Sequence, residues 1–282
     1  MIFIGRLVNC ISQPSFNGIM VVNVMQLTDR EFQLISELVY KSFGINLGER
    51  KRNLVIARLQ KVLLAGGFKS FGEYYDHVVG DTSGRALLTL VDHLSTNHTY
   101  FFREKDHFDF LTSHVLPEIC KGPKNGRHKL RLWSAGCSSG EEPYTLAMVL
   151  MDYLSNNRLN VDAGILATDI SVSVLNTAIA GIYPNEKLAN VPISYRQSYF
   201  SQLNNGYWAV KQVLKDMVLY RRLNLMSPEF HFKGLFQVVF CRNVMIYFDK
   251  VTQRELIKRF HRYIEPGGYL FIGHSETIER EL

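Results

Sequence analysis

A short glycine-rich segment is the first place in the sequence where chemistry could occur. It reads Gly136-Cys-Ser-Ser-Gly140-Glu141-Glu142 and ends in two adjacent carboxylates. Glycines let a backbone approach a ligand closely, but this spacing matches neither the GxGxxG nor the GxxxxGK[ST] phosphate-binding pattern. Two carboxylates repel a pyrophosphate and attract a cationic ligand or ribose hydroxyls. The segment therefore predicts a site for such a ligand; the alternative is a tight turn followed by acids at a helix start.

Two other groups of polar residues accompany this segment. Asp169 ends a β-rich run, where an acid in nucleoside-binding α/β folds accepts hydrogen bonds from ribose hydroxyls. Its alternative role is that of an acid at the start of the helix that Ser171 caps. The segment that begins at Asn97 reads Asn-His-Thr-Tyr-Phe-Phe-Arg-Glu. Core packing explains its two phenylalanines but not Asn97, Thr99 and Arg103 together, so these three are candidate ligand contacts.

The pattern after about residue 127 predicts the elements that must position these groups. Short β-rich runs alternate with capped helices, which is typical of a parallel α/β sheet. The expected strands are 130–135, 163–169, 235–241 and 269–273, and the expected helices are 143–153, the segment after Ser171, and one that opens with a Thr252/Glu255 capping box and closes at 266–268. The glycine segment then lies where the first strand passes to its helix, in the crevice where such sheets bind nucleotide-like ligands.

Residues 25–95 predict a small all-α domain ahead of this sheet. Thr28 and Glu31 form a capping box, apolar residues follow at helical spacing, and Gly44 is placed to end the helix. The remaining expected elements are a helix over 49–65, a helix opened by a Ser70/Glu73 capping box, a helix over 85–94, and a linker with a helix over 96–126.

Two segments depart from this plan. Between residues 183 and 224 the alternation gives way to aromatic-rich runs joined by Asn204-Asn205-Gly206, a strong turn signal. We therefore expect a small antiparallel insertion at about 188–222 within the domain formed by 127–282. Residues 1–24 are expected to be a disordered extension or the product of a misassigned start. A secretory signal is the alternative, but the segment lacks a small-residue cleavage site.

The composition indicates a globular protein of about two domains. The chain has 282 residues, a mass of 32.4 kDa and 46% hydrophobic residues. No run approaches the roughly 18 apolar residues that a membrane span requires. The net charge of +6 permits an acidic partner but is far milder than that of a histone-like protein. The 4 cysteines show no CxxC pairing and no histidine at metal-ligand spacing, so reduced thiols, no metal and a cytoplasmic location are expected.

Several motifs follow one another along the chain from Met25 onward. They are Asn97-x-Thr-x-Phe-Phe-Arg-Glu104, Leu132-Trp-Ser-Ala-Gly-Cys-Ser-Ser-Gly-Glu-Glu-Pro-Tyr144, Ala167-Thr-Asp-Ile170, Ala180-Gly-Ile-Tyr183, Asn224-Leu225, Phe240-Cys-Arg-Asn-Val-Met-Ile-Tyr-Phe-Asp249, Pro266-Gly-Gly268 and Gly273-His-Ser-Glu276. This collinear set resembles the bacterial chemotaxis receptor methyltransferases, the CheR family. The resemblance implies a helical receptor-recognition domain followed by a Rossmann-like methyltransferase domain, with S-adenosylmethionine as cofactor and S-adenosylhomocysteine as product.

The resemblance also implies a role for each polar group. Asn97, Thr99 and Arg103 would contact the cofactor from the linker, with Arg103 near its methionine end and the incoming carboxylate. A carboxylate of Glu141 or Glu142 would hold the amino-acid part. The other implied cofactor contacts are Gly136 in the glycine segment, Asp169 at the ribose or adenosine side, Asn224 and Leu225 at the adenine, and Arg242 and Asn243 at the strand end. Tyr247 would lie beside the sulfonium and its methyl group.

The implied reaction is methyl transfer to the side-chain carboxylates of receptor glutamates. A glutamate with an ordinary pKa of about 4.3 is ionised at neutral pH, so ester formation needs alignment rather than a strong general base. Arg103 can orient the carboxylate, and Tyr247 can wall the site against water. These two are therefore the expected catalytic residues.

Lys51, Arg58 and Lys61 are expected on one face of the second helix, at spacings of seven and three. A solvated surface explains such a stripe. The resemblance raises the alternative that it docks on the acidic cytoplasmic helices of methyl-accepting chemotaxis receptors. The short turn between Phe200 and Tyr207 argues against a tether to a receptor C-terminal peptide. Because basic residues are dispersed rather than clustered with aromatics, we expect no nucleic-acid binding. We also expect no membrane insertion and a monomer.

Two other functions compete with this one. The chain stops at Leu282, soon after Gly-His-Ser-Glu, where the related family continues into a final antiparallel strand. A catalytically inert cofactor-binding or scaffolding relative, made defective by that short end, is therefore the second hypothesis, although intact Arg103 and Tyr247 argue against it. A nucleic-acid methyltransferase is a distant third, because the Asn/Asp-Pro-Pro-aromatic signature of base methylation is missing from the sequence.

Overall fold

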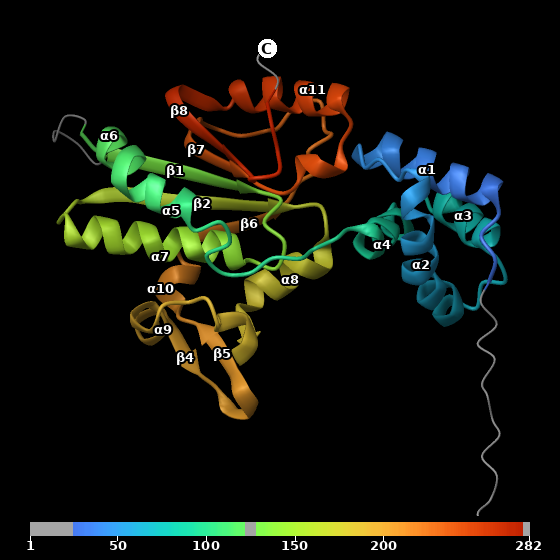
Figure 1. Cartoon of the computed structure of the whole chain (residues 1–282), viewed down its shortest axis with the longest axis horizontal. Helices are drawn as coiled ribbons and strands as arrows, with labels where there is room; N and C mark the ends of the chain where they lie inside the picture. The colour runs from blue at the N-terminus through green and yellow to red at the C-terminus, as the bar shows by residue number, and fades with distance from the viewer. Residues whose placement is uncertain (1–24, 122–127, 279–282) are drawn as a thin grey trace, which may run out of the picture.

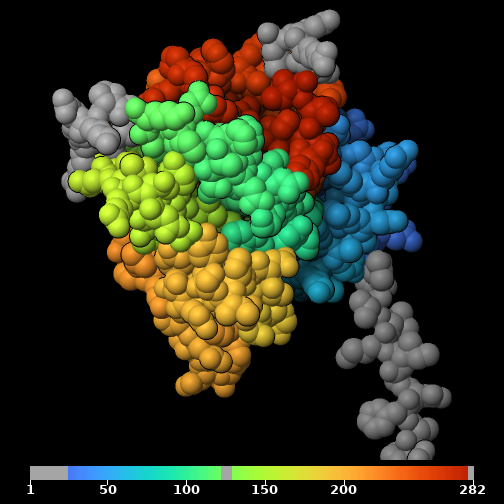
Figure 2. Space-filling view, turned by 60° about the vertical axis from the view of Figure 1, so that its left-hand side comes forward, coloured from blue at the N-terminus to red at the C-terminus, as the bar shows by residue number. Residues whose placement is uncertain are grey.

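The computed structural model describes residues 25–121 and 128–278, and the expected extension at 1–24 lies outside them. A group of helices from the first part of the chain packs against the side of a larger sheet domain, from which a small second sheet projects (Figures 1 and 2). The expected order, an all-α domain followed by a parallel α/β domain, is confirmed.

Local capping signals determine where the first helix of the α domain begins and ends. The Glu31 N–H donates to Thr28 Oγ1 while the Glu31 carboxylate accepts the Thr28 N–H, so the expected capping box forms. Gly44 ends the helix with a φ of 70°, in the left-handed region. The helices of this domain are α1 Asp29–Phe43, α2 Arg52–Gly66 with a 3-10 turn at Glu49–Lys51 before it, α3 Phe71–Gly80 and α4 Arg85–Leu94. They bury one core that includes Ile35, Val55 and Leu90.

The main sheet has five strands, all parallel, in the order β6-β2-β1-β7-β8. The strands are β1 His128–Ala135, β2 Val161–Asp169, β6 Val218–Arg222, β7 Phe236–Cys241 and β8 Ile264–Ile272. β7 is buried along its whole length, as expected for a central parallel strand that reads as an apolar run. The chain leaves β1 toward β2 on one side and later returns to β7 on the other, so the topology reverses between β1 and β7.

Helices cover both faces of this sheet (Figure 1). Alternate residues of β1 point to opposite faces: Leu132 joins the core beneath α7, and Trp133 joins the core beneath α11. Phe108 of α5 stacks on Phe240 of β7 in the first of these cores. The helices are α5 Asp106–Phe110, a π-helical turn Leu111–Val115, α6 Leu116–Ile119, α7 Glu141–Asn156, α8 Val172–Ala180 and α11 Lys250–His261.

The expected antiparallel insertion is present, but its boundaries differ from 188–222. Its sheet has the order β3-β5-β4, with strands β3 Ile182–Pro184, β4 Phe200–Gln202 and β5 Tyr207–Val210, short helices α9 Ile193–Tyr199 and α10 Gln212–Lys215, and a 3-10 turn Asn185–Leu188. The predicted Asn-Asn-Gly turn lies at Asn204–Gly206. The insertion therefore starts earlier, and residues 218–222 are edge strand β6 of the main sheet.

One predicted helix start, one helix end and one capping box are also corrected. Asp249, not Thr252, is the N-cap of α11, because Asp249 Oδ1 accepts the Thr252 N–H at 2.8 Å and takes the capping position first. That helix ends at His261, and the Pro-Gly-Gly run at 266–268 lies inside β8, where Gly267 has a φ of 80° beside a register shift. At α3 the Glu73 carboxylate accepts the Lys69 N–H, so the second capping box is only half formed.

Other expectations concern the membrane and the thiols. Within the described ranges, no helix is both long enough and apolar enough to cross a membrane. Cys120, Cys137 and Cys241 are free thiols, as expected.

Candidate active site

A pocket opens at the carboxyl ends of the central strands, next to the point where the topology reverses. All the residues predicted to contact cofactor or to be catalytic line it, except Glu141: Asn97, Thr99, Arg103, Gly136, Glu142, Asp169, Asn224, Leu225, Arg242, Asn243 and Tyr247. The α domain supplies Phe43 and Ile45 to the same wall. The pocket is therefore built from both domains and the linker between them.

The glycine segment forms the floor of the pocket through a close backbone approach. The N–H groups of Gly136 and Cys137 donate to the Thr168 carbonyl at 2.8 and 2.9 Å, which ties the segment to the end of β2. Gly136 has a φ of 83°, and a Cβ there would lie 2.4 Å from Val244 Cγ2. A glycine is thus required where the loops after β1 and β7 meet.

The structure separates the two adjacent glutamates. Glu141 is fully buried and turned toward the insertion, where it accepts from Lys187 Nζ at 3.0 Å and Ser139 Oγ at 2.6 Å. Glu142 lines the pocket and accepts from Ser134 Oγ at 2.6 Å. Burial raises the pKa of Glu142, and the nearby Arg242 opposes that rise. Of the two predicted alternatives, Glu142 is the one placed to meet a ligand in the pocket.

The structure places Asp169 both at the start of α8 and in the lining of the pocket. Its carboxylate accepts the Ser171 N–H at 3.0 Å at the start of α8, and the Ser138 N–H of the glycine segment at 2.8 Å. It also lines the pocket. Burial raises its pKa, while these backbone hydrogen bonds act in the opposite direction. Asp169 therefore fixes the geometry of the glycine segment and presents negative charge to the pocket.

The linker crosses the pocket and places Arg103 at its edge. Arg103 Nη1 donates to the His98 carbonyl at 2.8 Å, and its guanidinium lies 5.8 Å from the ring centroid of Tyr100. Ser138 Oγ donates to the Asn97 carbonyl at 3.0 Å, which holds the linker on the glycine segment. Among residues 25–121 and 128–278, no acidic side chain forms an ion pair with Arg103. Its guanidinium is thus available to a carboxylate from outside.

Arg242 is a second cation at the pocket, and it is committed to the protein. Its side chain is 1% exposed and lies between two acids, with Nη1 3.1 Å from Glu142 Oε2 and Nη2 3.1 Å from Glu104 Oε2. It also donates to the Arg103 carbonyl, and its guanidinium lies 5.4 Å from the ring centroid of Phe108. A buried cation between two carboxylates joins the linker to β7 and α7.

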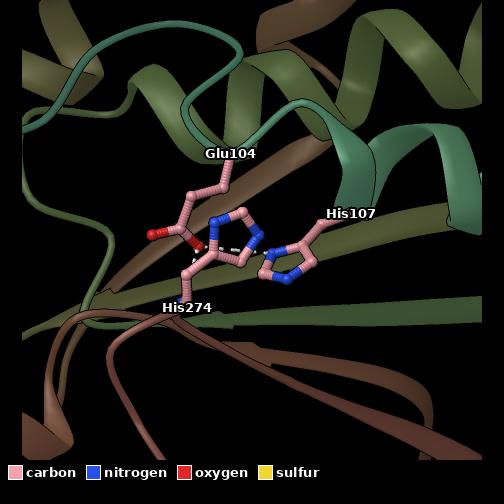
Figure 3. Close-up of side chains that lie close together, drawn as sticks. All are labelled: Glu104, His107 and His274. Atoms are coloured by element: carbon pink, nitrogen blue, oxygen red, sulfur yellow. Dashed lines mark hydrogen bonds and ion pairs between the residues drawn. The ribbon is translucent and has the colours of Figure 1, made fainter.

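Glu104 carries the other half of this connection, in a cluster with His107 and His274 (Figure 3). The candidate ligand atoms of the three lie within 4.8 Å of one another. However, Glu104 already accepts from Arg242 and from Asn243 Nδ2 at 3.2 Å, and the guanidinium beside it disfavours a dication. Burial lowers the pKa of His107, and Arg242 lowers it further. Glu104 therefore fits a support that holds the linker to the strand ends better than it fits a metal ligand.

Tyr247 lies where the two domains meet. Its hydroxyl donates to the Thr96 carbonyl at 3.4 Å, and its own carbonyl accepts the Asn46 N–H at 2.9 Å. The Lys51 ammonium lies 5.5 Å from its ring centroid. The phenol thus stands between the linker and the α domain at the pocket wall.

Asn224 also joins the domains. Its Nδ2 donates to the Ser42 carbonyl at 2.8 Å and its Oδ1 accepts the Met226 N–H at 2.9 Å. Leu225 beside it is buried and contributes apolar wall. The polar side chain of Asn224 is thus engaged in the fold, and the apolar part of this wall comes from Leu225.

The three predicted receptor-docking cations do not form one exposed stripe. Lys51 lies in the 3-10 turn before α2, where its Nζ donates to the Asn46 carbonyl at 2.7 Å. Arg58 donates to the carbonyls of Leu94 and Ser95 at 2.6 and 2.8 Å, so it caps the end of α4 and holds the linker. Lys61 alone of the three is exposed. The spacing argument was wrong here because it ignored the nearby unsatisfied carbonyls at the end of α4.

Three residues with clear structural roles at the site had no role in the sequence argument. They are Glu104, which pairs with Arg242, Lys187, which pairs with the buried Glu141, and Glu276, whose carboxylate accepts backbone N–H groups from the loop after β7. Glu104 and Glu276 lie within the collinear motifs of the sequence, and their place there could have marked them as site residues. No feature of the sequence marked Lys187.

Comparison with known proteins agrees with this geometry. Residues 30–95 match the family described as CheR methyltransferase, all-alpha domain, and residues 97–282 match CheR methyltransferase, SAM binding domain. The chain is 48% identical over 255 residues to the chemotaxis protein methyltransferase of Borreliella burgdorferi, with 90% of each protein covered. It is 38% identical over 259 residues to the chemotaxis protein methyltransferase of Escherichia coli, covering 90% of this chain and 86% of that protein. The chain belongs to the CheR family of S-adenosylmethionine-dependent chemotaxis methyltransferases.

Proposed function

We propose that this protein transfers a methyl group from S-adenosylmethionine to the side-chain carboxylates of glutamates in the cytoplasmic helical region of methyl-accepting chemotaxis receptors. The observation that carries the proposal is the contrast between the two arginines at the pocket. Arg242 is enclosed by two protein carboxylates, whereas Arg103 has no such partner among the described residues and stands at the pocket edge. An unpaired guanidinium there suits an incoming carboxylate.

The residues of the pocket fit S-adenosylmethionine. Glu142 and Asp169 supply negative charge for a ligand that carries an ammonium, a sulfonium and ribose hydroxyls. Ile170, Leu223 and Leu225 supply apolar wall for a base. When bound, the cofactor supplies an electrophilic methyl group.

The protein's own residues then have three tasks. The substrate glutamate is already ionised at neutral pH, with an ordinary pKa of about 4.3, so no proton has to be removed. Arg103 orients that carboxylate toward the methyl group, and orientation of this kind contributes a large part of such rate enhancements. Tyr247 and the linker exclude water around the reacting atoms. The products are a glutamate methyl ester and S-adenosylhomocysteine.

The α domain is the surface proposed to meet the receptor. Lys61 of α2 is exposed, and Lys51 stands where the α domain reaches the pocket wall at Tyr247. Burial lowers the pKa of Lys51, which weakens its hold on the proton in the free protein. A receptor helix that carries acidic residues would be drawn to this edge of the pocket by charge complementarity.

The proposal is tested by methyl transfer to membranes that contain chemoreceptors. The full chain is incubated with labelled S-adenosylmethionine and such membranes, and calorimetry on the same protein measures cofactor binding. Alkali-labile label on the receptor band is the expected result, because glutamyl methyl esters hydrolyse in base. Cofactor binding with no label on receptors from the matching organism would refute the proposal and leave an inert cofactor-binding protein.

A further inference from the structure

We infer that Glu276 is a positioning residue that holds the loop carrying Asn243 and Tyr247 in its working conformation. The carboxylate is buried and lies in the turn after β8, outside the set of residues that line the pocket. This inference rests on the proposed function for the role of Tyr247. The position of Glu276 itself rests on hydrogen-bond geometry alone.

The Glu276 carboxylate accepts hydrogen bonds from backbone N–H groups at two neighbouring strand ends. Its Oε2 accepts the Asn243 N–H at 2.9 Å and the Gly273 N–H at 2.6 Å, and its Oε1 accepts the Ile246 N–H at 3.2 Å. The Asn243 and Ile246 groups belong to the loop after β7, and the Gly273 group to the end of β8. One carboxyl side chain thus bridges both loops through three hydrogen bonds.

The backbone around this contact is shaped to permit it. Asn243 has a φ of 59°, an uncommon conformation for a residue other than glycine. Gly273 lies so close that a Cβ there would be 2.6 Å from Asn243 Nδ2 and 2.9 Å from Asn243 N. Without the Glu276 carboxylate, the three N–H groups would lose their acceptor, and the loss is most costly at Gly273, whose N–H is buried.

The loop leads directly into the pocket. Ile246, whose N–H the carboxylate accepts, immediately precedes Tyr247, and Asn243 and Tyr247 both line the pocket. Glu104 holds the same loop from the other side through Asn243 Nδ2. Glu276 therefore acts on the reaction through Tyr247 and not by contact with substrate or cofactor.

The test compares E276Q with E229Q in the full chain. Glutamine offers one oxygen where glutamate offers two, so at least one of the three N–H groups loses its acceptor. Glu229 is exposed on the loop before β7, which makes the same substitution there a matched control. Hydrogen–deuterium exchange of peptides that span 242–248 is measured together with kcat for methyl transfer and Kd for S-adenosylhomocysteine.

We expect E276Q to raise deuterium uptake in 242–248 and to lower kcat at least about tenfold, since small displacements of a reacting geometry cost that much or more. The Kd should stay within about threefold of wild type, with one cofactor bound per chain, because a positioning role lowers kcat without reducing the folded fraction. E229Q should match wild type in all three. Unchanged uptake or unchanged kcat in E276Q would overturn the inference.

Two further variants keep the result interpretable. E276D retains both oxygens on a shorter side chain, so it should fold even if E276Q does not and should show smaller changes in the same direction. Adding E276Q to Y247A should slow transfer by less than about twofold if Glu276 acts through the Tyr247 side chain, and a full repeat of its effect would contradict this. If the wild-type chain binds cofactor but methylates no receptor, the proposed function fails, and the exchange data still decide whether Glu276 holds the loop.

Discussion

Arg242 Nη1 lies 3.1 Å from Glu142 Oε2, so a side chain from the end of β7 is paired with one from the first turn of α7, across the point where the sheet reverses its order. The same guanidinium reaches Glu104 on the linker. One buried cation therefore connects the glycine segment's helix, the linker and the loop that carries Tyr247.

Arg242→Met should destabilise the protein by about 3–5 kcal/mol, because it leaves the carboxylates of Glu104 and Glu142 buried without their cation. Urea unfolding measures the change. Arg221→Met at an exposed position of β6 serves as the control and should cost less than about 0.5 kcal/mol. Adding Glu142→Gln to Arg242→Met should recover part of the loss, and no recovery would contradict the pairing.

Arg103→Ala should lower kcat for methyl transfer by about 100-fold, the scale seen when one preorganised polar contact to a reacting group is removed. The Kd for S-adenosylhomocysteine should change by less than about threefold, since the substitution removes an interaction with the substrate carboxylate. Single-turnover transfer and calorimetry measure the two quantities. Equal losses in both would show that Arg103 holds the cofactor and does not orient the carboxylate.

Arg58→Met and Lys61→Met separate a role in the fold from a role at the surface. Arg58 donates to the Leu94 and Ser95 carbonyls, so its loss should lower the free energy of unfolding by about 1–3 kcal/mol. Lys61 is exposed, so its loss should leave stability within about 0.5 kcal/mol while weakening receptor binding. Urea unfolding and a receptor pull-down provide the comparison, and equal stability of the two variants would refute the assignment.

The stability of the protein should depend on pH through His107. Burial lowers its folded-state pKa below that of the unfolded chain, so below about pH 6.5 the unfolded state binds a proton more readily and stability falls as pH falls. His107→Asn should therefore lose less stability than wild type between pH 7 and pH 5. His231→Asn, at an exposed position, is the control. Identical acid profiles for His107→Asn and wild type would contradict the assignment.

Local signals in the sequence were sufficient for most of the fold. The Thr28 capping box, Gly44, the Ser171 cap and the apolar run of β7 each act within a few residues, and the structure contains all of them. The errors arose where two local signals competed. Asp249 precedes Thr252 as an equally good cap, and a Pro-Gly-Gly run can end a helix or bend a strand. Whether the Pro-Gly-Gly run at 266–268 ends a helix or bends a strand is decided only by the packing of β8 on β7.

The site shows a different limit. The polar residues that line the pocket could be predicted because motifs mark strand ends, and strand ends meet at one edge of a parallel sheet. The sequence could not predict which of Glu141 and Glu142 faces the pocket. That choice depends on Lys187 in the insertion, which pairs with Glu141 from 46 positions later in the chain. The role of Arg58 was hidden for the same reason, since its acceptors lie on another helix.

The α domain contributes Phe43 and Ile45 to the wall of the methyltransferase pocket. A domain that only recognised the receptor could be exchanged among relatives without affecting the chemistry. Here a substitution in or just after α1 can alter the enclosure of the pocket as well, so the residues of the two domains that meet there must match. A chimera that joins the α domain of one relative to the sheet domain of another would need matched residues where the two domains form the pocket wall in order to keep its methyltransferase activity.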